Sequence, residues 1–226
     1  MAPWTLRYAD GPVRAIAIPV KSLGYAKSRL SSVLTELERA ALTLAMFEDV
    51  LDAADAVEGW DTWVVTPDET VLEIAMARHA HTVVEERPSL AAAIQQVEDE
   101  AVARTLEALA IVPADIPLLT ASALRSAVHT LGPVVIAPSV DERGTNLLLR
   151  RPPVAIPSRF GVDSYRRHLE TAAERDLPIA VVEREELAFD VDEPGDILTV
   201  LRAGRPGRTF EVCRDLDVAG RLGART

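Results

Sequence analysis

Short apolar runs alternate with helical segments along most of the chain, and this alternation limits the folds open to it. Runs with the length and composition of strands cover 14–20, 61–66, 81–85, 107–113, 133–138 and 145–150, with two less regular runs at 178–183 and 187–191. Helical periodicity covers about 35–57, 68–79, 89–105, 120–131, 162–176 and 194–203. Alternation of this kind predicts a mostly parallel, Rossmann-like sheet with helices on both faces, and thus a three-layer α/β/α fold.

The length of the chain, 226 residues, has room for one full α/β domain and is short for two. We expect a single domain over 1–203. Residues 204–226 show no clear apolar periodicity, which is typical of a loosely attached tail.

Composition excludes several classes of partner. The formal net charge of −11 argues against a nucleic acid or an anionic membrane, because both need a broad basic surface. No apolar run approaches the roughly 20 residues that span a bilayer, and the first residues lack the pattern of a signal peptide. The single cysteine, Cys213, excludes an internal disulfide and fits a reducing compartment. We therefore expect a cytoplasmic protein.

Both lysines of the chain, Lys21 and Lys27, lie with Arg29 in the loop that follows the first predicted strand. In a parallel sheet, ligands bind beyond the carboxyl ends of the strands. The loop contains neither a Walker A motif nor a G-x-G-x-x-G motif, but flexible ammonium groups suit a phosphate chain. This concentration of lysines indicates polyphosphate binding, and a solvated basic loop is the alternative.

Three carboxylates follow predicted strands. Asp115 comes directly after the apolar run at 107–113, and Asp190 and Asp192 lie two apart in "FDVDEPGD". If they meet at one edge of the sheet, their mutual repulsion favours a bound cation, and oxygen ligands of this kind suit Mg²⁺. Taken singly, the same residues also fit turn and helix-cap positions. Together with the cationic loop, they predict a magnesium site.

Five segments resemble one known family. They are "IPVKSLGYAKSRLS", "PADIPLL", "RGTN", "RFGVDSYRRH" and "FDVDEPGD". They occur in the order seen in the 2-phospho-L-lactate/phosphoenolpyruvate guanylyltransferases of coenzyme F-420 biosynthesis. The resemblance covers about 14–200. It implies a compact nucleotidyltransferase fold similar to that of the molybdenum-cofactor guanylyltransferases.

The resemblance also implies an activity, the transfer of GMP from GTP to phosphoenolpyruvate or 2-phospho-L-lactate with release of pyrophosphate. It implies a nucleotide half over about 14–120 and, over about 133–200, an acceptor half with a small acceptor-binding insertion. The expected partners are the two substrates and the enzyme that consumes the unstable product. The resemblance implies that Asp115, Asp190 and Asp192 serve catalysis and hold Mg²⁺, and that Thr145, Gly161 and Ser164 bind the acceptor. The cations of the first loop, Lys21, Lys27 and Arg29, are then expected to hold the triphosphate of GTP.

The chain departs from the usual family pattern at Ala91, Arg143 and Glu193. Two alternatives therefore remain open: a nucleotidyltransferase of the same fold that acts on another phosphorylated acid or sugar, and a non-catalytic nucleotide-binding subunit. The histidines are expected to be structural; they are His79, His81, His129 and His168.

Overall fold

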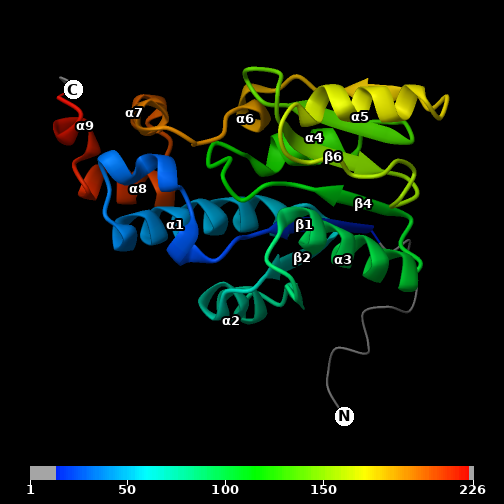
Figure 1. Cartoon of the computed structure of the whole chain (residues 1–226), viewed down its shortest axis with the longest axis horizontal. Helices are drawn as coiled ribbons and strands as arrows, with labels where there is room; N and C mark the ends of the chain where they lie inside the picture. Colours follow the sequence, from blue (N-terminus) through cyan, green and yellow to red (C-terminus); the bar gives the residue numbers. More distant parts are fainter. Residues whose placement is uncertain (1–13, 224–226) are drawn as a thin grey trace, which may run out of the picture.

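A single twisted sheet runs through the computed structural model, which describes residues 14–223 (Figure 1). Its strand order is β3-β2-β1-β4-β6-β5-β7. The strands are β1 (Arg14–Pro19), β2 (Asp61–Thr66), β3 (His81–Val84), β4 (Ala108–Ile111), β5 (Val134–Pro138), β6 (Thr145–Arg150) and β7 (Ile179–Val181). Only β6 runs antiparallel to its neighbours, β4 and β5; the other described pairs are parallel. The mostly parallel sheet predicted from the sequence is confirmed.

Helices cover both faces of the sheet. Helices α1 (Glu36–Asp55), α2 (Glu69–Ala77) and α4 (Ala121–Val128) pack on the face that includes Ile16 and Ile18 of β1. Helix α3 (Leu90–Ala103) packs on the opposite face, against Ala15 and Ala17, and α5 (Ser164–Ala173) packs on that face beside β5 and β6. Alternate residues of β1 therefore belong to two different cores, as the period of a buried strand requires. The predicted three-layer α/β/α fold is confirmed.

Local signals set the helix starts. Thr35 accepts a hydrogen bond from the backbone N–H of Glu38, whose carboxylate accepts one from the N–H of Thr35, so the first turn of α1 is capped from both sides. Asp68 caps α2 by accepting from the N–H groups of Thr70 and Val71. Before α1, the lysine-containing loop forms two short 3₁₀ helices, η2 (Leu23–Tyr25) and η3 (Ser28–Ser32).

The strand predicted at 187–191 is wrong. Residues 185–188 form the short helix α6 (Glu185–Ala188), and the chain then passes the end of β4 in an extended conformation. One backbone hydrogen bond, from the N–H of Val191 to the carbonyl of Asp115, joins it there. A segment that crosses the edge of the sheet makes isolated contacts instead of a ladder, which is why its apolar alternation did not produce a strand.

The C-terminal segment is also more ordered than its sequence predicts. After α7 (Pro194–Ala203), helices α8 (Arg208–Asp215) and α9 (Val218–Arg221) gather beside α1 at one end of the molecule (Figure 1). Cys213 and Val218 are buried in one cluster with Leu42 and Met46 of α1. The expectation of a loosely attached tail is therefore wrong for 208–221, because these short helices bury apolar side chains that a local window does not reveal. Residues 1–13 and 224–226 lie outside the described residues, and with them the N-terminal segment judged for a signal peptide.

Among residues 14–223, no helix combines the length and the apolar composition needed to cross a bilayer.

Candidate active site

The carboxyl ends of β1, β4 and β5 and the amino end of β6 meet at one edge of the sheet, because β6 runs opposite to the others. A cleft of about 370 Å³ opens at this edge. Five residues singled out in the sequence line it: Lys21, Lys27, Arg29, Asp115 and Asp192. The structure thus brings together the cationic loop after β1 and two of the three predicted carboxylates.

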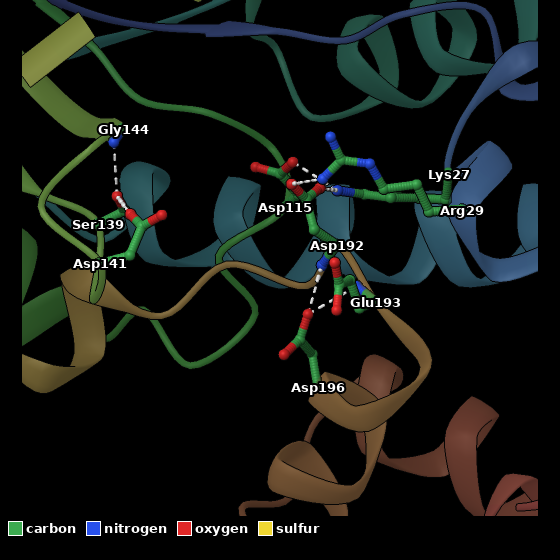
Figure 2. A network of polar contacts seen from close by, with 9 residues as sticks. All are labelled: Lys27, Arg29, Asp115, Ser139, Asp141, Gly144, Asp192, Glu193 and Asp196. Atoms are coloured by element: carbon green, nitrogen blue, oxygen red, sulfur yellow. Dashed lines mark hydrogen bonds and ion pairs between the residues drawn. The ribbon is translucent and has the colours of Figure 1, made fainter. Parts of the chain in front are cut away.

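Lys27, which lines this cleft, bridges the carboxylates of Asp115 and Asp192 (Figure 2). Its ammonium nitrogen Nζ lies 2.6 Å from Oδ2 of Asp115 and 3.0 Å from Oδ1 of Asp192. Only 10% of the Lys27 side chain is exposed. Burial lowers the pKa of Lys27, but the adjacent carboxylates of Asp115 and Asp192 outweigh burial and raise the pKa above its ordinary value. The ammonium is therefore fully charged at neutral pH.

The backbone places this lysine. Lys27 has a left-handed conformation with a φ of 51° at the start of η3, so the chain turns there and directs the side chain to the carboxyl end of β4. Arg29, one residue into the same 3₁₀ helix, adds a longer contact of 3.3 Å from Nη1 to Oδ2 of Asp192. Asp192 therefore contacts both cations through its two oxygens.

Asp192 is held from the other side by the start of α7. Oδ2 of Asp196 accepts hydrogen bonds from the backbone N–H groups of Asp192 and Glu193, at 2.8 and 2.7 Å (Figure 2). This cap fixes the backbone at the point where the Asp192 side chain turns toward the cleft. Glu193 itself is the N-cap residue of α7, which accounts for an acidic side chain at that position.

The third predicted carboxylate, Asp190, lies near the pair without joining it. Burial and then the negative charges of Asp115 and Asp192 together raise the pKa of Asp190 to about 6, against an opposing hydrogen bond from Asn146. Within residues 14–223, no group of three or more His, Cys, Asp or Glu side chains is arranged to hold a metal ion. The three-aspartate cluster expected from the sequence is therefore not assembled in this structure.

The carboxylates of Asp115 and Asp192 are nevertheless placed to bind one cation together. Oxygens of Asp115 and Asp192 both lie within hydrogen-bond distance of one nitrogen atom, so they converge on a single point that already carries positive charge. Mg²⁺ commonly binds through one or two carboxylates and completes its shell with water and substrate phosphates. The pair Asp115 and Asp192 has the right chemistry for that mode of binding.

The residues predicted to bind the acceptor lie beside the antiparallel strand. Thr145 starts β6 and Ser164 starts α5, and the Ser164 hydroxyl donates to Oγ1 of Thr145 at 3.1 Å. The structure therefore brings together two residues that lie 19 positions apart. Thr145 is 4% exposed and Ser164 is 2% exposed, so in this conformation their hydroxyl groups face protein more than solvent.

Gly161 lies in the turn that precedes α5. Its φ of +113° belongs to a region that L side chains rarely adopt, and a Cβ atom built there would meet nothing within 4 Å. Backbone conformation, and not crowding by the protein, accounts for this glycine. Helix α5 begins at Ser164, not at Val162 as its sequence suggests, and the N–H groups of Ser164 and Tyr165 donate to the carbonyls of Gly161 and Arg143. These two N–H groups are not free to bind an anion.

A tight turn over 139–144 connects β5 to β6 at the same edge (Figure 2). The Ser139 hydroxyl accepts from the N–H of Gly144 at 2.7 Å and donates to Asp141 at 2.6 Å. The Ser139 hydroxyl and the N–H of Arg143 together lower the pKa of Asp141. A Cβ on Gly144 would lie 2.8 Å from the Ser139 oxygen, so this turn requires glycine next to Thr145.

The sequence analysis gave no role in the site to three residues of this region, Leu90, Phe160 and His168. Phe160 lines the cleft together with Leu90, the first residue of α3. His168, assigned no role from the sequence, is fully buried and contacts Thr145 through Nδ1 at 3.1 Å. The available signal was its spacing, because His168 lies four residues after Ser164 and therefore on the same side of α5.

Comparison with known proteins gives one consistent result at the level of sequence. A family model described as "Guanylyl transferase CofC like" matches residues 14–222. A phosphoenolpyruvate guanylyltransferase of Rubrobacter xylanophilus is 37% identical over 83% of this chain and 93% of its own. A 3-phospho-D-glycerate guanylyltransferase of Phenylobacterium zucineum is 38% identical over 84% and 91%, and a 2-phospho-L-lactate guanylyltransferase of Archaeoglobus fulgidus is 33% identical over 89% of each.

Solved structures agree on the fold. A protein of Desulfovibrio desulfuricans G20 described as a nucleotide-diphospho-sugar transferase superposes with a TM-score of 0.76 at 20% identity, over 94% of this chain and 99% of that one. A nucleotidyl transferase from Methanothermobacter superposes with a TM-score of 0.59 at 15% identity, over 85% and 98%. At these identities, the similarity establishes the nucleotidyltransferase fold and gives no information about the substrates.

Proposed function

Because the chain belongs to the CofC-like guanylyltransferase family, we propose that it transfers GMP from GTP to phosphoenolpyruvate and releases pyrophosphate. The chain is a nucleotidyltransferase enzyme by family and by fold. In the three relatives described above, the acceptor named is a three-carbon acid that carries a phosphate: phosphoenolpyruvate, 3-phospho-D-glycerate or 2-phospho-L-lactate. Membership in this family also supports a place in coenzyme F-420 biosynthesis and, with the sequence composition, a cytoplasmic location.

The observation that carries the proposal is the Lys27 contact with Asp115 and Asp192 inside the cleft. It places a charged ammonium and a pair of carboxylates at the carboxyl ends of parallel strands, where nucleotides bind in folds of this class. Lys21 and Arg29 line the same cleft. Three cations around one opening suit the triphosphate of GTP, whose negative charge otherwise prevents approach to the acidic edge.

The transfer needs little chemistry from the protein. An oxygen of the acceptor phosphate attacks the α-phosphorus of GTP in line, the bond from that phosphorus to the bridging oxygen of the β-phosphate breaks, and pyrophosphate leaves with the electron pair. The attacking oxygen is already anionic, so no side chain has to remove a proton. Catalysis is then a matter of alignment and of stabilising the charge on the phosphates. In this scheme Lys27 and Arg29 move from the carboxylates to the phosphate oxygens.

Asp115 and Asp192 would hold Mg²⁺ in this scheme, and the ion would neutralise charge on the α- and β-phosphates. With a pKa of about 6, the Asp190 carboxyl is mostly ionised at neutral pH. It would add negative charge beside Asp115 and Asp192, which favours a bound cation.

The test combines purified protein, GTP and Mg²⁺ with each of the three phosphorylated acids in separate reactions, and a phosphorylated sugar in a fourth. Pyrophosphate release gives the rate, and mass spectrometry identifies the product. We expect a GMP adduct with phosphoenolpyruvate at the highest kcat/KM. A preference for 3-phospho-D-glycerate, supported by the relative of Phenylobacterium zucineum, would correct the acceptor. The absence of any adduct would refute GMP transfer to these acids.

A further inference from the structure

We propose that His168 is a positioning residue for the acceptor, because it hydrogen-bonds both the turn at 159–163 and the start of β6, two segments that carry residues predicted to bind the acceptor. This inference rests on the proposed function and concerns how the acceptor half keeps its shape. His168 comes from α5, and its relative exposure is 0%.

The imidazole connects two segments that are otherwise separate in the sequence. Its Nε2 accepts a hydrogen bond from the backbone N–H of Arg159 at 2.8 Å, and its Nδ1 lies 3.1 Å from Oγ1 of Thr145. Arg159 begins the turn that contains Gly161, and Thr145 begins β6. A single buried ring therefore links the turn that contains Gly161 directly to Thr145, two of the positions predicted to contact the acceptor.

The hydrogen bonds also determine the tautomer. A backbone N–H can only donate, so Nε2 must carry a lone pair, and a neutral ring then carries its proton on Nδ1. Burial, and then the charges of Arg150, Arg167 and Arg159, lower the pKa of His168 to about 3, so the ring is neutral at any working pH. The Nδ1–H group consequently donates to Thr145.

These two contacts leave the Thr145 hydroxyl able to act only as a hydrogen-bond donor. Its hydroxyl oxygen accepts from His168 and also from the Ser164 hydroxyl, which occupies both lone pairs. The hydroxyl proton is the only hydrogen-bonding capacity that remains, and it can only be donated. A carboxylate or phosphate oxygen of the acceptor is the matching partner.

The ring also contacts the cleft through Phe160. The centroids of the Phe160 and His168 rings lie 5.3 Å apart with an interplanar angle of 73°, an edge-to-face contact, and Phe160 lines the cleft that contains Lys27 and Asp115. Movement of His168 would therefore shift both the acceptor turn and the wall that faces the nucleotide cleft. Its main effect should fall on the acceptor, because both of its hydrogen bonds go there.

The kinetic test uses two substitutions. His168→Phe keeps the ring and removes both hydrogen bonds, whereas His168→Gln places an amide oxygen near the position of Nε2 and can still accept from Arg159. With phosphoenolpyruvate varied at saturating GTP, we expect His168→Phe to raise the acceptor KM by at least about tenfold and the GTP KM by less than about twofold. His168→Gln should recover part of the loss. His81→Phe is the matched control, because His81 hydrogen-bonds Glu100 from the edge strand β3.

The second readout needs no activity. Nitrogen NMR of the unmodified protein should show a non-titrating imidazole between pH 5 and 8 with its proton on Nδ1. A proton on Nε2, an unchanged acceptor KM in His168→Phe, or equal increases in both KM values would each overturn the inference. If the unmodified protein forms no adduct with any of the three acids, the proposed function fails, and the NMR result still decides the tautomer. If His168→Phe does not fold, His168→Gln and the NMR spectrum provide the test.

Discussion

Replacing Lys27 by methionine should change the binding of two ligands in opposite directions. The Lys27 ammonium occupies the point on which Asp115 and Asp192 converge, 2.6 and 3.0 Å from their oxygens. A divalent ion must displace this ammonium before it can bind the two carboxylates. Methionine has a similar length and no charge, so it removes the competitor and leaves the carboxylates in place.

The size of the effect follows from these contacts. A hydrogen bond between charged groups contributes about 1.5–3 kcal/mol, and a bound ion has to replace at least one such bond. Lys27→Met should therefore tighten the binding of Mn²⁺ to the nucleotide-free protein by about 10- to 100-fold. The same substitution removes a cation from the triphosphate site and should raise the KM for GTP by a similar factor, about 10- to 100-fold.

Electron paramagnetic resonance of free Mn²⁺, titrated with protein, measures the first effect, and pyrophosphate release measures the second. Lys21→Met is the matched control, because Lys21 lines the same cleft and, among the described residues, forms no ion pair. The control should weaken the use of GTP with little change in the affinity for Mn²⁺. If Lys27→Met binds Mn²⁺ no more tightly than Lys21→Met does, the ammonium does not compete with the ion and this reasoning is wrong.

Four further outcomes are expected. Asp115→Asn should lower kcat by about 100-fold or more while the unfolding temperature changes little, because one charge at the phosphate site is lost; a normal turnover would contradict the proposed metal pair. Gly161→Val should raise the acceptor KM without changing the GTP KM, since its φ of +113° is strained for valine; parallel titrations of both substrates decide this. Truncation after Gly204 should reduce the free energy of unfolding in urea by about 4 kcal/mol or more, because it uncovers the apolar cluster on α1, and an unchanged midpoint would show that α8 and α9 are dispensable. Finally, unfolded His168 takes up a proton below about pH 6.5 and the folded ring does so only near pH 3, so acid favours unfolding. Between pH 6.5 and 5.5 the unmodified protein should lose about 1 kcal/mol more of its free energy of unfolding than His168→Gln, as urea titrations at the two pH values can check.

The elements of this fold and the outline of its site follow from local sequence. Strand and helix periods, the Thr35–Glu38 cap and the Asp68 cap act within a few residues, so a short window contains the information that determines them. The placement of Lys27 and Asp115 at one edge was also predictable. Loops that follow parallel strands must emerge at the same side of the sheet, whatever the order of the strands.

The contacts that give these residues their chemistry depend on the tertiary structure. Lys27 meets Asp115 across 88 positions and Asp192 across 165, and no local pattern encodes either distance. The reversed strand β6 sets Thr145 beside α5, where burial keeps His168 neutral and hydrogen-bonded. Packing on α1 likewise ordered the segment 208–221, which has no regular period of its own. The burial of a side chain and the charges around it depend on segments that are distant in sequence, and only the folded chain brings those segments together.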